Sequence, residues 1–188
     1  MFIRLAPVSI AGLCLLFASG FIQAGDAMIN WPEGWQIESL PVEADVAGKP
    51  AAPLRQRAVK NDQAGNPMMV MELTQSPLVA GHQVNVEGVL LEMRKSIQVM
   101  FARSGFQSVC TRTRQGTLSQ MPALETTCTI TQNGVHVMTQ TLVATANKEM
   151  AWSLSYAGSA AGYAATKEEA QRIRDGLRLG VGQGQTPE

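Results

Sequence analysis

The sequence predicts an α+β fold, in which an antiparallel sheet is flanked by helices. Two short strand-like segments come first, and an amphipathic helical stripe follows them. Four segments rich in threonine, valine and aromatic residues come next, and a second helical segment follows. The order strands, helix, four strands, helix favours strands that pair with their neighbours and helices that pack on the resulting sheet.

The first two strands are bracketed by turn-forming segments. Residues 48–53 read GKPAAP and residues 61–67 read NDQAGNP, and both compositions are typical of loops. They delimit a strand over 54–59. The segment MMVMEL over 68–73 predicts a second strand, which Pro77 and Gly81 end.

The first helix is predicted over residues 86–101. Asn85 is a suitable N-cap and Gly105 a suitable C-terminal stop. We expect Met93 and Met100 to be ordinary core residues on this stripe. The apolar residues recur at steps of three and four, as on one face of a helix: Val86, Val89, Leu90, Met93, Ile97, Met100 and Phe101.

The four later strands read SVCTRTR (108–114), LETTCTITQ (124–132), VHVMTQTLVAT (135–145) and MAWSLSY (150–156). Asn133-Gly134 is the signal of a two-residue hairpin turn. It predicts Ile130 opposite Val137 and Cys128 opposite Thr139. In the last strand, one face is expected to carry Met150, Trp152, Leu154 and Tyr156.

The last helix is predicted to begin at Thr166, with Glu169 three residues later as a capping box. Its apolar stripe carries Ala170, Ile173 and Leu177, and Gly180 ends it. The tail over 181–188 is expected to be disordered.

The N-terminus resembles a secretory signal over residues 1–24. Arg4 supplies the charge, an apolar stretch runs from Leu5 to Phe21, and Ala24-Gly25 is a suitable cleavage point. Residues 25–180 then form a single α+β domain. No later apolar run is long enough to span a bilayer. We therefore expect a periplasmic (Gram-negative) or secreted protein without an integral membrane segment after signal removal.

The charge is balanced, with 15 Lys and Arg against 15 Asp and Glu. This balance argues against nucleic acid or anionic lipid as an electrostatic partner.

Removal of the signal leaves two cysteines, Cys110 and Cys128. An even pair in an exported chain predicts a disulfide. If the two residues face each other across an antiparallel pair, Arg114 faces Leu124 and residues 115–123 form a connecting loop.

A resemblance to known families rests on short motifs. The Pro-x-Gly-Trp corner at 32–35, the central helix, the meander ending in an aromatic strand and the final IRDGLRL (173–179) resemble the α/β sandwich of PsbP-type photosystem proteins and Ran-binding Mog-type proteins. More narrowly, the signal, WPEGW (31–35) and the cysteine pair resemble an uncharacterised exported family of pseudomonads, a domain of unknown function. The resemblance spans most of residues 28–180. It implies a fold, an exported location and a binding or accessory role.

WPEGW places Trp31 and Trp35 four residues apart around a proline and a glycine. A type I turn with Pro32 second and Glu33 third would lay both rings against the edge of the sheet. We favour this structural corner over a binding platform, although both tryptophans stay candidates for contacting a ligand or partner.

Methionine is frequent in this sequence, and its side chain is able to bind metal ions. Thioethers are soft ligands suited to Cu(I), and Met69 and Met71 share one strand face, with His82 or His136 as a further ligand. A copper cofactor is thus an alternative to core packing of the methionines, which we favour. For His136 we favour a solvent-facing strand position. Cys-x-x-Cys, His-Glu-x-x-His and the phosphate-binding Gly-rich loop are absent from the sequence.

A basic cluster is a further candidate for anion or partner binding. Arg112 and Arg114 alternate onto one face of their strand, the face of Cys110, which suggests that the disulfide lies toward the outer side of the sheet. Ile130 and Val137 are expected on that same face, so the pattern leaves both sides of this hairpin open as the inner one. Arg94, Lys95 and Arg103 belong to the neighbouring helix. We favour a solvated face as the interpretation.

An enzyme is the least supported class. The mature chain holds two histidines and no Gly-x-Ser-x-Gly elbow, so a hydrolytic triad has no support. Four glutamates remain as candidates for paired carboxylate chemistry: Glu72, Glu87, Glu92 and Glu125. The preferred hypothesis is a non-enzymatic accessory or binding protein for an envelope protein or small ligand. The alternatives are an envelope copper-binding protein and a hydrolase.

Overall fold

The computed structural model describes residues 27–38, 40 and 53–180 of the 188-residue chain. The predicted signal over 1–24 and the predicted tail over 181–188 lie outside the described residues. The elements are β1 (Trp35–Glu38), β2 (Leu54–Asn61), β3 (Pro67–Pro77), α1 (Val86–Arg103), β4 (Gln107–Cys110), β5 (Arg114–Leu118), β6 (Met121–Gln132), β7 (Val135–Ala146), β8 (Met150–Ser159) and α2 (Ala160–Gly176). The antiparallel sheet flanked by helices is therefore confirmed.

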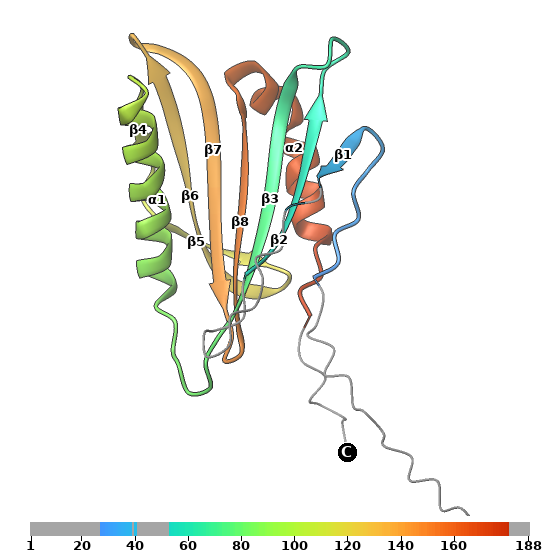
Figure 1. Ribbon diagram of the computed structural model, residues 1–188, viewed down its shortest axis with the longest axis vertical. Helices are drawn as coiled ribbons and strands as arrows, with labels where there is room; N and C mark the ends of the chain where they lie inside the picture. The colour runs from blue at the N-terminus through green and yellow to red at the C-terminus, as the bar shows by residue number, and fades with distance from the viewer. Residues whose placement is uncertain (1–26, 39, 41–52, 181–188) are drawn as a thin grey trace, which may run out of the picture.

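The described strands form one eight-stranded sheet. Its order is β1-β2-β3-β8-β7-β6-β4, and β5 pairs with β6 as well. In Figure 1 the long strands β3, β8, β7 and β6 stand side by side, with α1 along one side and α2 behind β3 and β2. The helices thus pack mainly on the long central strands, and the short strands β1 and β4 lie at the edges.

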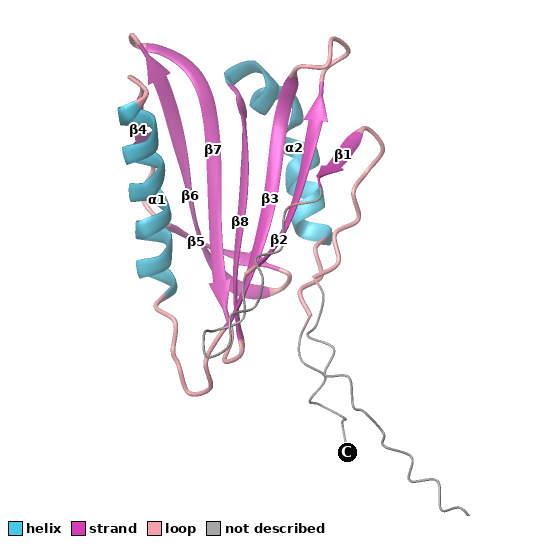
Figure 2. Cartoon of the chain, viewed as in Figure 1, coloured by secondary structure: helices cyan, strands magenta, loops and turns pink. Residues whose placement is uncertain are grey.

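The two helices pack on opposite faces of the sheet. On β7, Leu142 and Ala144 pack with Leu90 of α1, whereas Val143 between them belongs to the cluster that contains Ile173 of α2. Successive strand side chains point to opposite faces, so α1 and α2 lie on different sides. The result is a sandwich with the sheet, drawn in magenta in Figure 2, as its central layer.

The larger core lies between the sheet and α2. Met69 and Met71 of β3 are fully buried in it. The predicted face of β8 is confirmed, because Trp152, Leu154 and Tyr156 are buried in the same cluster and Met150 packs against it.

The first predicted helix is confirmed as α1. The Asn85 side chain accepts a hydrogen bond from the Gly88 amide at 3.1 Å, and Gly105 has a φ of 79° after the helix. The expected burial of Met100 is wrong, since its side chain is 54% exposed. The helix contacts β7 through Leu90 and Ile97, and Met100 lies outside this contact.

The predicted start of the last helix is wrong. Helix α2 begins at Ala160, with Ser159 as N-cap, and ends at Gly176 instead of Gly180. Thr166 lies inside the helix, where its hydroxyl donates to the Gly162 carbonyl. Gly162 lowers the helix propensity of the first turn of α2, but the packing of this turn against β3 outweighs the low propensity.

The Asn133-Gly134 turn is confirmed between β6 and β7, but the predicted register is wrong. Ile130 pairs with Met138 rather than Val137, and Cys128 pairs with Gln140. The register shifts between Ile130 and Thr131. Such a bulge inserts one extra residue and moves every later pair by one.

The predicted loop over 115–123 is also wrong, because these residues form the β5–β6 hairpin. Arg114 pairs with Glu125 instead of Leu124, and Leu118 pairs with Met121. The two turn residues, Ser119 and Gln120, have φ of 50° and 66°. A two-residue hairpin loop of this type favours Asn or Gly, so Ser-Gln gives no turn signal in the sequence.

Candidate functional site

A groove of about 790 Å³ runs beside α1, on the face of the sheet that carries this helix. Helix α1 contacts β4, β6 and β7, and no comparable contact with β8 or β3 is found among the described residues. The helix wall of the groove is formed by Val89, Met93 and Ile97, the floor by Gln140, Leu142 and Ser155, and the rim by Asn85, Gly88, Glu92 and Ser96. The volume is that of a small-molecule site, and the groove is broadly open to solvent.

The groove exists because β8 has large and small side chains on opposite faces. Trp152, Leu154 and Tyr156 face the α2 core, while Ser153 and Ser155 face the groove side. Short serine side chains fill little of the space beside the helix. The strand sequence AWSLSY therefore buries one face and leaves a hollow on the other.

The lining combines an apolar wall with an uncharged polar floor. Gln140 and Ser155 are half-buried, and neither side chain forms a hydrogen bond to any residue that the structure describes. Their amide and hydroxyl groups are therefore available to a bound molecule. Near the start of α1 a small hollow of about 60 Å³ adjoins the same helix, lined in part by Val86, Val89 and Ser153.

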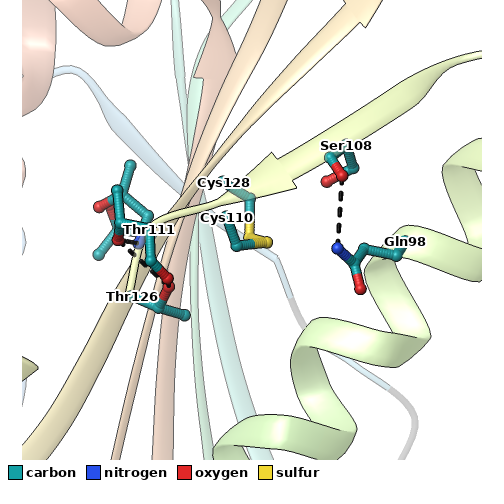
Figure 3. The surroundings of a disulfide bond; sticks show 8 residues. Gln98, Ser108, Cys110, Thr111, Thr126 and Cys128 are labelled. Atoms are coloured by element: carbon teal, nitrogen blue, oxygen red, sulfur yellow. Dashed lines mark hydrogen bonds between the residues drawn. A yellow bond between two sulfur atoms is a disulfide. The ribbon is translucent and has the colours of Figure 1, made fainter. Parts of the chain in front are cut away.

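The Cys110–Cys128 disulfide fixes the strand that follows α1. It joins directly paired residues of β4 and β6, as predicted, with an S–S distance of 2.01 Å. Figure 3 shows it on the side of the sheet that faces α1, where Gln98 donates to the Ser108 carbonyl at 3.4 Å. The expected placement of the disulfide toward the outer side is wrong, since Cys128 is fully buried.

Aromatic packing adds to this connection. The rings of Phe101, at the end of α1, and Phe106, just before β4, meet edge to face with centroids 6.0 Å apart. The Phe106 amide also donates to the Phe101 carbonyl at 3.0 Å. The helix wall of the groove is thus joined to β4, which the disulfide joins to β6.

The WPEGW segment forms a structural corner. The Trp31 and Trp35 rings lie 5.5 Å apart, and Trp35 is 8% exposed. The turn lies one residue later than predicted: the Trp35 amide donates to the Pro32 carbonyl, and Gly34 takes a φ of 86°. This left-handed position suits glycine and explains the shift.

Glu169 connects this corner to α2. Its carboxylate accepts from Trp35 Nε1 at 3.1 Å and from Lys60 Nζ at 2.5 Å. Burial raises the pKa of Glu169, but the hydrogen bonds from Lys60 and Trp35 outweigh burial and hold the pKa below the ordinary 4.5. The ionised form is therefore favoured by folding.

Glu169→Gln is expected to lower the free energy of unfolding by about 1 kcal/mol at pH 7, because the charged pair with Lys60 is lost. A folded pKa below the unfolded one contributes stability above the unfolded pKa, and this contribution disappears as the pH falls through the folded pKa. The stabilities of wild type and variant from urea unfolding should therefore begin to converge as the pH falls below 4.5 and meet below the folded pKa. The exposed neighbour Glu168, changed to Gln, is the control. A difference that stays constant with pH would contradict this role for Glu169.

The predicted basic cluster is divided between two faces of the sheet. Arg114 lies 3.4 Å from Glu125, which also pairs with Arg174 of α2 at 2.5 Å. Arg114 therefore points toward the α2 side, away from the face of Cys110, because the register with β6 shifts by one residue between β4 and β5. Arg112 is exposed in the break between these strands. The helix residues Arg94, Lys95 and Arg103 lie on the α1 side.

A hydrogen-bonded chain beside Glu125 links α2 to the sheet. The Tyr163 hydroxyl lies 2.6 Å from Thr141 Oγ1, which lies 2.9 Å from Thr127 Oγ1. Burial raises the pKa of Tyr163 to about 12. The phenol therefore stays protonated at neutral pH, and the chain serves packing of the helix.

The copper candidates occupy separate environments. Met69 and Met71 are fully buried in the α2 core. His82 is exposed in the loop after β3, and His136 is exposed beside the β6–β7 turn, where its ring bonds Thr139. Within residues 27–38, 40 and 53–180, no three His, Cys, Asp or Glu side chains are grouped to hold a metal ion. Copper binding stays a sequence prediction.

The four candidate carboxylates are dispersed. Glu72 on β3 pairs with Arg55, Glu92 on α1 pairs with Lys95, and Glu125 on β6 pairs as described above. Glu87 lies in the first turn of α1.

The family of the chain follows from its sequence over almost the whole described domain. Residues 26–179 match the family described as "Domain of unknown function (DUF4946)". The chain belongs to the DUF4946 family. No curated protein matches the sequence.

Solved structures share the fold of this DUF4946 protein. The solution structure of cyanobacterial PsbP (CyanoP) from Synechocystis sp. PCC 6803 is similar with a TM-score of 0.55 at 11% identity, over 93% of this chain and 99% of that chain. LpqN, described as involved in cell envelope biogenesis of Mycobacterium tuberculosis, is similar with a TM-score of 0.53 at 16% identity, over 86% of this chain and 88% of that chain. These likenesses confirm the PsbP-type fold that the sequence motifs predict.

Sequence reasoning missed the groove of this DUF4946 chain. The sequence predicts Val89, Met93 and Ile97 on the apolar stripe of a helix, with Met93 as a core residue, and Gln140 and Ser155 belong to no motif. The signal in the sequence is the alternation of small and large residues in β8, which leaves only small side chains on one face of this central strand.

None of the helices in the described part of the chain is long and apolar enough to cross a bilayer.

Proposed function

We propose that this DUF4946 protein is a non-enzymatic, exported binding protein that holds a small, largely apolar ligand in the groove beside α1. The groove carries the proposal. It combines a suitable volume, an apolar helix wall and a few convergent polar groups, which is the usual composition of a ligand site.

Other features support the class of function. Glu169 and Tyr163, whose pKa values are altered, hold α2 against the sheet and lie outside the groove lining. The candidate carboxylates are ion-paired or dispersed. An accessory role fits these observations better than paired-carboxylate hydrolysis.

Export and an envelope role belong to the same proposal. The signal-like N-terminus and the disulfide both favour an oxidising compartment. LpqN, which shares the fold, is described as involved in cell envelope biogenesis. We therefore place the ligand or partner of this protein in the cell envelope.

Binding of N-phenyl-1-naphthylamine, an uncharged dye that fluoresces in apolar surroundings, tests the proposal. The wild-type protein should give saturable fluorescence. Ser155→Phe should weaken dye binding at least about tenfold, because the ring fills the groove floor. The matched control is Thr74→Phe on β3, which faces the same side one strand away and does not line the groove.

Circular dichroism and urea unfolding check that both variants are folded. Equal dye binding by the wild type and both folded variants would contradict the groove as the site. Absence of saturable binding to the wild type would contradict the proposed function itself.

A further inference from the structure

We infer that the groove takes an uncharged single-chain amphiphile of the monoacylglycerol type, and that it discriminates against a fatty carboxylate. The inference rests on the proposed function, because it names the ligand class of the same site. Three properties of the lining carry it: the sign of its charge, the chemistry of its floor and the shape of its wall.

The lining offers no positive charge. Among the described residues that form the groove, Glu92 alone is charged. Its side chain is 74% exposed, and its carboxylate lies 3.9 Å from Lys95 Nζ. A carboxylate ligand would leave water without gaining a counterion and would approach a group of its own sign. An uncharged head group has neither penalty.

The start of α1 does not replace the missing cation. A helix N-terminus favours anions through its free amides. Here the Asn85 side chain already accepts from the Gly88 amide, and the Asn85 carbonyl accepts from the Val89 amide. Glu87 places a carboxylate in the same turn. The partial positive charge of this end is therefore largely compensated within the chain.

The floor matches a neutral polar head group. Gln140 and Ser155 both donate and accept, and neither is engaged by another side chain in the described structure. Hydroxyl and ester groups make the complementary bonds. A pure hydrocarbon would leave both side chains without partners and cost free energy.

The wall matches an extended chain. Val89, Met93 and Ile97 follow one another at steps of four residues along α1. From Asn85 to Ile97 the helix is about 18 Å long, at about 1.5 Å per residue. This elongated apolar wall favours a linear acyl chain over a compact ring system.

Displacement of N-phenyl-1-naphthylamine from the full mature protein by two matched amphiphiles tests the inference. Monododecanoylglycerol and dodecanoate share one acyl chain and differ in charge. At pH 8 and below their micelle concentrations, the glycerol ester should displace the dye at about a tenfold lower concentration. Equal potency, stronger displacement by dodecanoate, or displacement by neither would overturn the inference.

Two variants separate the contributions of charge and hydrogen bonding. Glu92→Lys should improve displacement by dodecanoate several-fold and leave the ester unchanged. Gln140→Leu should weaken the ester several-fold more than it weakens the dye, whose affinity is measured directly in each variant. If dye binding is saturable and abolished by Ser155→Phe but neither variant alters selectivity, the proposed function stands and the ligand class is wrong. If the dye does not bind in the groove, the proposed function fails and the inference fails with it.

Discussion

Replacing Gly162 by alanine is expected to lower the free energy of unfolding by about 3 kcal/mol, or about 10 °C in melting temperature. A Cβ at this position would lie 2.4 Å from the Met68 carbonyl oxygen and 2.9 Å from the Met68 Cα. Both are backbone atoms of β3, so relief requires the first turn of α2 to move away from the sheet. Helix propensity alone predicts the opposite sign, a stabilisation of up to about 1 kcal/mol.

Thermal and urea unfolding measure this effect. Gly176→Ala, at the other end of α2, is the matched control, because a Cβ there meets nothing within 4 Å. The control should be neutral or slightly stabilising. If Gly162→Ala were equally neutral, the close approach of α2 to β3 would be wrong. Gly158, whose Cβ would lie 2.2 Å from the same oxygen, offers an independent repeat.

The same glycines explain which elements the sequence predicts. Helix α1 is predicted closely because its N-cap, its apolar stripe and its terminal glycine are all local signals. Helix α2 begins with Ala-Ala-Gly, and the glycine in its first turn is required by contact with a distant strand. Such a requirement is tertiary and leaves no local signal, so local patterns predict the start at the later cap, Thr166.

The hairpins show a similar division. Asn133-Gly134 has the composition that its turn demands, and the turn is where the sequence predicts it. The bulge beside Ile130 and the Ser119–Gln120 turn adopt backbone conformations that their sequences do not announce. A missed register shift of one residue reverses the faces of a strand. The bulge beside Ile130 therefore prevents prediction of the inner side of the β6–β7 hairpin, and the separate shift between β4 and β5 prevents prediction of the face of Arg114.

The candidate site was the hardest part to predict because the groove forms where the side chains of β8 beside α1 are small. Periodicity identifies Val89 and Met93 as apolar helix residues but does not show that no side chain of β8 reaches them. Motif analysis favours reactive residues at characteristic spacings, and Gln140 and Ser155 belong to no such motif. The groove appears only when the register places Ser155 and Leu142 side by side across from α1.

Removing the disulfide is the second change with a large expected effect. The double variant Cys110→Ser, Cys128→Ser should lower the free energy of unfolding by about 3 kcal/mol, because 18 residues separate the cysteines and the closed loop restricts the unfolded chain. Replacing both residues avoids a free buried thiol. Urea unfolding should give the same loss for wild-type protein in excess reductant. Alkylation followed by mass measurement confirms that the reduced sample has lost the bond. Unchanged stability in both cases would contradict a stabilising disulfide.

The loss should be concentrated in one region. Strand β4 has four residues and lies at the edge of the sheet, so the disulfide is a large share of what holds it to β6. Helix α1 leads directly into β4 through the Phe101–Phe106 contact, and α2 has no such connection. Hydrogen exchange in the double variant should therefore accelerate in β4 and the C-terminal half of α1 well before it changes in α2. Since α1 is the wall of the groove, dye binding should weaken in the same variant. Uniform acceleration over both helices would mean that the disulfide stabilises the whole domain and does not specifically fix the groove.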